Sequence, residues 1–122
     1  GDEVLIKVAG IIKSNCRTSD IPSRFGGEEF AVILVETGKE GAFVYGEKIR
    51  KIVEESVFLY NDKEIKITIS VGITSYRDNN PKNSIDFISM ADKALYYSKK
   101  NGRNQINFYN ESMIKEDQWK RF

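Results

Sequence analysis

Hydrophobic residues recur every three or four positions in three segments of the chain, residues 2–16, 37–55 and 84–102. This spacing places them on one face of a helix and leaves most charged residues on the other face. Thr37 and Glu40 also have the spacing of a capping box, in which two side chains bond backbone N–H groups at a helix start. The pattern therefore predicts three amphipathic helices.

Other segments alternate between apolar and polar residues or are apolar throughout, as β-strands are. The alternation is strictest in residues 65–76, which we expect to form one half-buried strand. Gly26 and Gly27 lie between two further runs and predict a tight hairpin, because glycine reaches positive φ without steric cost. The predicted strands are residues 21–25, 29–35, 57–60, 65–76 and 104–109, with a loop at residues 77–83.

The order helix, hairpin, helix, hairpin, helix, strand predicts the α+β class. We expect a ferredoxin-like, palm-type sandwich, in which a mainly antiparallel sheet is flanked by helices. In that topology a strand inside the sheet precedes the first helix, so we expect an N-terminally truncated domain. The predicted domain comprises residues 1–109, and residues 110–122 form a charged tail.

The amino-acid composition limits the kinds of catalytic and metal sites that the chain can form. The 122 residues are 40% apolar and 30% charged, which fits one small domain with an ordinary core. The chain contains no His and one Cys, so it can form neither a His-dependent nucleophile system nor an intrachain disulfide. Any metal site is therefore expected to use oxygen ligands.

Charge is balanced, with 19 Lys and Arg residues against 18 Asp and Glu residues. No basic surplus attracts nucleic acid, and we expect no nucleic-acid partner. The longest apolar run, residues 30–35, is far shorter than the ~20 residues that span a bilayer. We therefore expect a cytoplasmic domain, whose parent protein could still be anchored to a membrane through another domain.

Two adjacent carboxylates, Glu28 and Glu29, follow Gly26 and Gly27 at the predicted hairpin tip. Adjacent carboxylates repel unless a cation lies between them, so this turn is a candidate site for a hard metal ion. The glycines let the phosphates of a ligand approach the backbone closely. A solvated turn whose acids point to water is the alternative.

Two basic residues, Lys99 and Arg103, occur at the end of the third predicted helix. They could clamp a polyphosphate, with Arg103 binding in a bidentate manner. Cations at a helix C-terminus also complement the helix dipole, which is the structural alternative. Arg17 and Asp20 form a commonplace turn with a possible ion pair.

The run Arg24-Phe25-Gly26-Gly27-Glu28-Glu29-Phe30 resembles the signature of the GGDEF domain of bacterial diguanylate cyclases, in its GGEEF form. The resemblance covers residues 1–109. Supporting matches in family order are Gly1-Asp2 with Leu5, Ser70-Val71-Gly72-Ile73, Ala91-Asp92-Lys93-Ala94-Leu95-Tyr96, and Lys99 with Gly102-Arg103-Asn104.

The resemblance implies an enzyme that condenses two GTP molecules to cyclic di-GMP and two pyrophosphates, with Mg²⁺ or Mn²⁺. It implies a homodimer in which two domains, each holding one GTP, face each other. Glu28 would be the catalytic metal ligand, and Glu29 a second one. The implied GTP contacts are Gly26 and Gly27 at the nucleotide, Lys99 and Arg103 at the β- and γ-phosphates, and Asp2 at the guanine edge.

Arg17 and Asp20 match the RxxD motif of the family, which binds the product cyclic di-GMP as an inhibitor. The chain departs from the family at its beginning. In the family a strand with a metal-binding Asp and a helix with a guanine-binding Asn precede the position of Gly1-Asp2. We therefore expect a cyclase as the parent protein, with a sensory or regulatory domain, and weak or no activity of this chain.

Two alternatives stay open. The domain could sense GTP or cyclic di-GMP without making product, for which Arg17 and Asp20 would serve equally well. It could also be a dimerisation scaffold whose acids and bases are merely solvated, in which case nucleotides would not change its stability.

Overall fold

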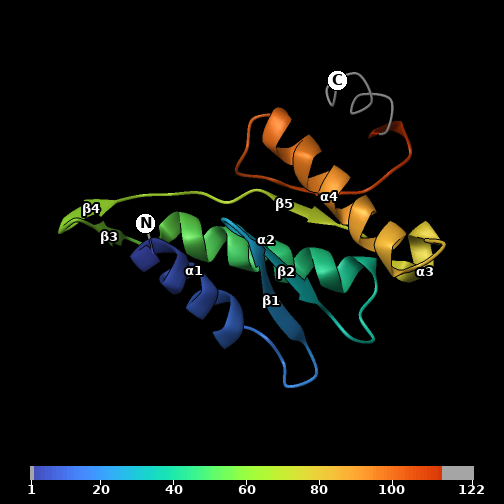
Figure 1. Cartoon of the computed structure of the whole chain (residues 1–122), viewed down its shortest axis with the longest axis horizontal. Coiled ribbons are helices and arrows are strands. Elements are labelled where there is room, and N and C mark those ends of the chain that lie inside the picture. The colour runs from blue at the N-terminus through green and yellow to red at the C-terminus, as the bar shows by residue number, and fades with distance from the viewer. Residues whose placement is uncertain (1, 114–122) are drawn as a thin grey trace.

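The structure is a computed structural model that describes residues 2–113 of the chain (Figure 1). The β3–β4 hairpin projects at one end of the molecule and α3 lies at the opposite end. The elements are α1 (Asp2–Ser14), β1 (Ile21–Gly26), β2 (Glu29–Ile33), α2 (Lys39–Glu55), β3 (Phe58–Tyr60), β4 (Lys63–Ile65), β5 (Val71–Ile73), α3 (Tyr76–Asn79), α4 (Ser84–Lys100) and β6 (Ile106–Phe108).

The described strands pair in three two-stranded sheets, β1–β2, β3–β4 and β5–β6. The first two are antiparallel hairpins, and the third is parallel because α4 carries the chain across from β5 to β6. The fold is thus α+β, as predicted, with helices packed on short sheets. None of the described helices is long and apolar enough to cross a membrane.

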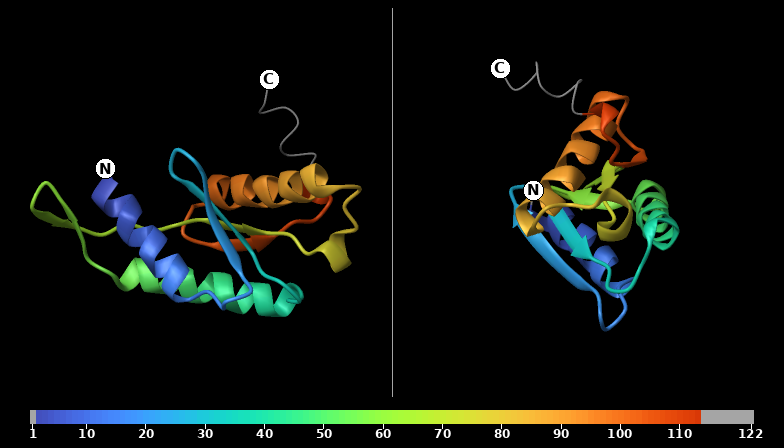
Figure 2. Two further views of the ribbon diagram at one scale, coloured as in Figure 1. Left: turned by 60° about the horizontal axis from the view of Figure 1, so that its bottom comes forward. Right: turned by 90° about the vertical axis from the view of Figure 1, so that its right-hand side faces the viewer.

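The parallel pair β5–β6 lies between two helices (Figure 2). Successive residues of a strand face opposite sides, so Gly72 faces α4 while Val71 and Ile73 face α2. A Cβ atom at Gly72 would lie 2.1 Å from the backbone N of Leu95 and 2.5 Å from the carbonyl O of Ala91. The backbones of α4 and β5 are therefore in direct contact.

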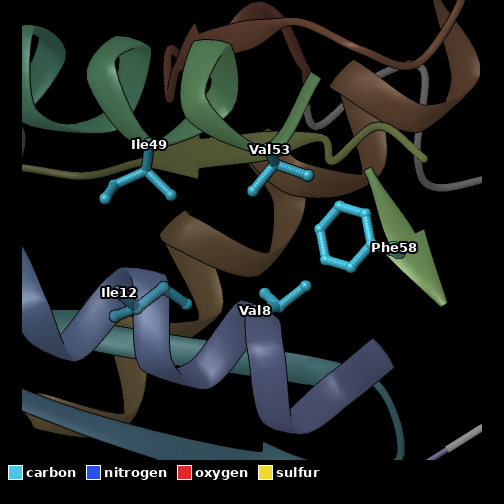
Figure 3. Close-up of a cluster of buried hydrophobic side chains, with 5 residues drawn as sticks. All are labelled: Val8, Ile12, Ile49, Val53 and Phe58. Carbon is cyan, nitrogen blue, oxygen red and sulfur yellow. The ribbon is translucent and has the colours of Figure 1, made fainter. Parts of the chain in front are cut away.

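A main hydrophobic core joins α1, α2 and β3 (Figure 3). Amphipathic spacing in both helices directs their apolar faces toward Phe58, which is completely buried. A second cluster contains Ala94, Tyr109 and Met113. The buried residues of the main core are Val8, Ile12, Ile49, Val53 and Phe58.

The single strand predicted for residues 65–76 is wrong. β4 ends at Ile65, β5 covers only Val71–Ile73, and residues 66–70 pair with no described strand. The alternation is real all the same, because Ile65, Ile67 and Ile69 pack against the main core. The alternation of apolar and polar residues indicates which side chains are buried, whereas a hydrogen-bonded β-ladder also needs a partner strand.

Two local predictions also fail. The loop predicted at residues 77–83 begins with the one-turn helix α3, where the Asn79 side chain accepts a hydrogen bond from the Ser75 backbone N at 2.8 Å. The capping box at Thr37 does not form, because Gly38 is the N-cap of α2 and makes no side-chain bond. The Thr37 hydroxyl instead donates to the Val35 carbonyl and accepts from Arg17.

The domain boundary at residue 109 and the charged tail from residue 110 stay predictions. The structure adds that Met113 is buried against Tyr109. Residues 114–122 of the predicted tail lie outside the described residues.

The contact at Gly72 generates a stability prediction. Gly72→Ala should lower the free energy of unfolding by about 3 kcal/mol, because the new Cβ meets backbone atoms that no side-chain rotation can move. Gly10→Ala is the matched control. No atom outside its own helix lies within 4 Å of the new Cβ, so this change should stabilise α1 by up to ~1 kcal/mol. Urea unfolding measures both, and equal midpoints for Gly72→Ala and the parent chain would refute the contact.

Candidate functional site

The tip of the β1–β2 hairpin has a backbone that favours glycine. Gly26 has φ 125° and Gly27 has φ 53°, and the strand register shifts between Arg24 and Gly26. No atom lies within 4 Å of a Cβ built on either glycine. Backbone conformation rather than crowding therefore requires these glycines, and the space beside them is open to a ligand.

Arg24 holds this tip from within the hairpin. Its guanidinium donates from Nε and Nη2 to the carbonyl oxygen of Gly27, at 3.1 Å and 2.7 Å. The two bonds tie the tip to β1. Arg24 was not among the predicted site residues, although its position three residues before Gly27 was an available signal.

The two residues of the predicted acidic pair, Glu28 and Glu29, lie in different environments. Glu28 is exposed, whereas Oε2 of Glu29 lies 3.7 Å from Nζ of Lys99. This ion pair is one-third to two-fifths exposed, so it adds at most ~1 kcal/mol to stability. Its importance is geometric, because it places the hairpin tip beside the C-terminal end of α4 (Figure 2).

Two other predicted GTP contacts are not joined to this pair by a described interaction. Arg103 is exposed in the turn after α4, where Gly102 has φ 118°, a conformation typical of a glycine that ends a helix. Asp2 is the first residue of α1, and its side chain lies outside the described part of the structure. Its contact with guanine therefore stays a prediction.

The carboxylates fit a hard cation by their chemistry. Glu28 and Glu29 offer the oxygen ligands that Mg²⁺ and Mn²⁺ prefer, and Glu28 is exposed beside the open glycine backbone. Among residues 2–113, no three His, Cys, Asp or Glu side chains form a group that could hold a metal ion. A cation at this hairpin would take its remaining ligands from water or from phosphate oxygens.

Arg17 and Asp20 form a hydrogen-bonded ion pair at a second location. The Arg17 Nη2 lies 2.9 Å from the Asp20 Oδ1, and the Arg17 backbone N lies 2.8 Å from Oδ2. The same Nη2 reaches the Val35 carbonyl at 2.8 Å and the Thr37 hydroxyl at 2.7 Å. The Asp20 side chain is 2% exposed, whereas that of Arg17 is 56% exposed. Sequence spacing predicted the pair but not its anchors after β2.

The family model "Diguanylate cyclase, GGDEF domain" matches residues 1–105. Diguanylate cyclase A of Treponema denticola is 47% identical over 116 residues, which are 94% of this chain and 31% of that protein. The chain belongs to the GGDEF domain family, which confirms the resemblance seen in the sequence. It spans only 31% and 24% of the curated relatives from T. denticola and Escherichia coli K12.

Two solved structures show the same fold. The active GGEEF domain of a Vibrio cholerae diguanylate cyclase has a TM-score of 0.75 and 31% identity, covering 90% of this chain and 69% of that one. The GGDEF domain of DgcB from Caulobacter crescentus, in complex with c-di-GMP, has a TM-score of 0.80 and 29% identity, covering 88% of this chain and 63% of that one.

The ion pair of Asp20 predicts a pH dependence. Hydrogen bonds from the Arg17 side chain and backbone hold the pKa of the Asp20 carboxyl below its usual value. A carboxyl with a lowered folded pKa stabilises the fold above its unfolded pKa of about 3.9, and this stabilisation is lost as the pH falls through the folded value. Asp20→Asn should therefore flatten the acid limb of stability against pH. Chemical denaturation at pH values from about 2 to about 6, a range that brackets this pKa, measures the free energy of unfolding of the parent chain and of Asp20→Asn. Parallel curves of this free energy against pH for the two chains would refute the prediction.

Proposed function

We propose that this chain carries the catalytic site of a diguanylate cyclase, which condenses two GTP molecules to cyclic di-GMP and two pyrophosphates. One observation carries the proposal. The acidic hairpin tip and the basic end of α4, distant in sequence, meet through Glu29 and Lys99 at 3.7 Å. Carboxylates for a cation beside cations for phosphate are what phosphoryl transfer on a nucleotide requires.

The roles of the side chains in this proposal are those that the resemblance to the family implies. The backbone at Gly26 and Gly27 lies against the nucleotide, because these residues have no side chain to block its approach. Glu28 holds Mg²⁺ or Mn²⁺ and helps activate the 3′-hydroxyl, with Glu29 as a second ligand. When bound, the ion neutralises charge on the phosphate oxygens. Lys99 and Arg103 bind the β- and γ-phosphates, and Asp2 binds the guanine edge.

Catalysis needs two copies, because each GTP must present its 3′-hydroxyl to the α-phosphate of the other. We therefore propose a homodimer as the active form, in the cytoplasm where GTP is available.

Arg17 and Asp20 form the inhibitory site for cyclic di-GMP. The half-exposed Arg17 side chain and the c-di-GMP complex of the Caulobacter relative support this site. A sensory or regulatory domain would control the dimer.

A second candidate is a module that binds GTP or cyclic di-GMP without turnover. The acidic hairpin favours it in one respect, because residues 2–113 bring no third acidic side chain to Glu28 and Glu29. Mg²⁺ demands near-octahedral coordination, so a site with two carboxylates binds the ion weakly. We accordingly propose that turnover by this chain is slow at best.

Product analysis separates the two candidates. Incubated with GTP and Mg²⁺, the chain should form cyclic di-GMP slowly, and Glu28→Gln should lower that rate at least tenfold, because it removes a charged metal ligand. Glu64→Gln is the matched control, an exposed carboxylate on β4 whose loss should leave the rate unchanged. Chromatography of the nucleotides measures the rates.

The outcomes are distinct. If no product forms but GTP or cyclic di-GMP raises the thermal midpoint of the chain, the domain is a binding module and not an enzyme. No product and no ligand-dependent midpoint would contradict both candidates.

A further inference from the structure

Three consecutive residues after α4 have a left-handed backbone. Gly102 has φ 118°, Arg103 has φ 60° and Asn104 has φ 46°. Glycine adopts this region freely and asparagine tolerates it, but for arginine it is uncommon and carries strain. Such a conformation persists only where surrounding interactions hold it.

The backbone of Arg103 is held on both sides. Its N–H donates to the Ser98 carbonyl at 3.0 Å, and its carbonyl accepts from Nε2 of Gln105 at 3.1 Å. The same Nε2 donates to the Asn101 carbonyl at 2.8 Å. These bonds join the turn to the end of α4.

The side chain of Asn104 joins the same turn to α2. Its Oδ1 accepts from Nη1 of Arg50 at 2.7 Å, and its Nδ2 donates to Oε2 of Glu54 at 2.6 Å. The Arg50 side chain is 12% exposed, and it also donates from Nη2 to Oε2 of Glu47 at 3.1 Å. The amide of Asn104 is thus fixed between a cation and an anion one helical turn apart.

The side chain of Arg103 differs from this well-bonded backbone. Within the described residues, no hydrogen bond or ion pair is recorded for its guanidinium, and the residue is exposed. Several polar contacts hold the backbone in a strained conformation, while the charged group stays open to solvent. That arrangement suits a cation that must bind a ligand from a fixed position.

We propose that Arg50, acting through Asn104, is a positioning residue for Arg103 and hence a determinant of affinity for the terminal phosphates of GTP. This inference rests on the proposed function, which assigns those phosphates to Lys99 and Arg103. Without the Arg50 contact the Asn104 amide loses one of its two anchors on α2 and keeps only the bond to Glu54. The turn then samples other conformations, and part of the binding energy is spent in ordering it.

The test compares GTP with GMP, which lacks the β- and γ-phosphates. Arg50→Ala should weaken GTP binding on the order of tenfold and leave GMP binding within about twofold, because only GTP reaches Arg103. Asn104→Asp keeps the side-chain volume but sets a carboxylate against Glu54, and it should act in the same direction. Titration calorimetry with Mg²⁺ measures both ligands.

Matched variants keep the outcomes separate. Lys51→Ala removes an equal charge from an exposed position on α2 and should change neither affinity. Arg103→Ala should lower GTP affinity at least as much as Arg50→Ala. If Arg103→Ala acts but Arg50→Ala and Asn104→Asp do not, the positioning role is overturned while the proposed function stands. If Arg103→Ala also leaves the ratio of GTP affinity to GMP affinity unchanged, the positioning role and the proposed function both fail. An equal loss for both ligands would show a merely structural role and overturn the inference.

Discussion

The backbones of α4 and β5 touch directly at Gly72, and this close approach fixes the position of the helix that carries Lys99. A side chain there would collide with Leu95 and Ala91, so only glycine lets the helix lie this close. The fully buried Ser98 reinforces the contact, because its hydroxyl donates to the Val71 carbonyl at 2.8 Å. These two contacts fix α4 against β5, and with it the positions of Lys99 and the following turn.

The candidate site is assembled from segments with separate supports. Arg24 holds the glycine tip within its own hairpin, the sheet positions α4, and Arg50 on α2 holds the turn through Asn104. The described interaction between hairpin and helix is one half-buried ion pair, from Lys99 to Glu29. The groups that would contact a nucleotide thus stay at the surface, while two of their supports, Ser98 and Arg50, are largely buried, which is the usual division between functional loops and their scaffold.

Much of this could be predicted from the sequence. Helical periodicity located the three long helices, and Gly26-Gly27 located the hairpin, because these signals are local. Two of the predictions failed because a distant partner decides the outcome. Residues 66–70 alternate but lack a described partner strand, and Thr37 bonds Arg17 instead of capping α2. The Arg50–Asn104 contact joins residues far apart in the chain, so no spacing rule could reveal it.

If the hairpin tip and the end of α4 form one GTP site, a nucleotide should perturb both segments at once. Amide chemical-shift mapping of the chain, titrated with GTP and Mg²⁺, measures this. The signals of Gly26, Gly27 and Gly102 should shift together along one saturation curve. Shifts confined to one of the two segments, or shifts that cluster elsewhere, would contradict it.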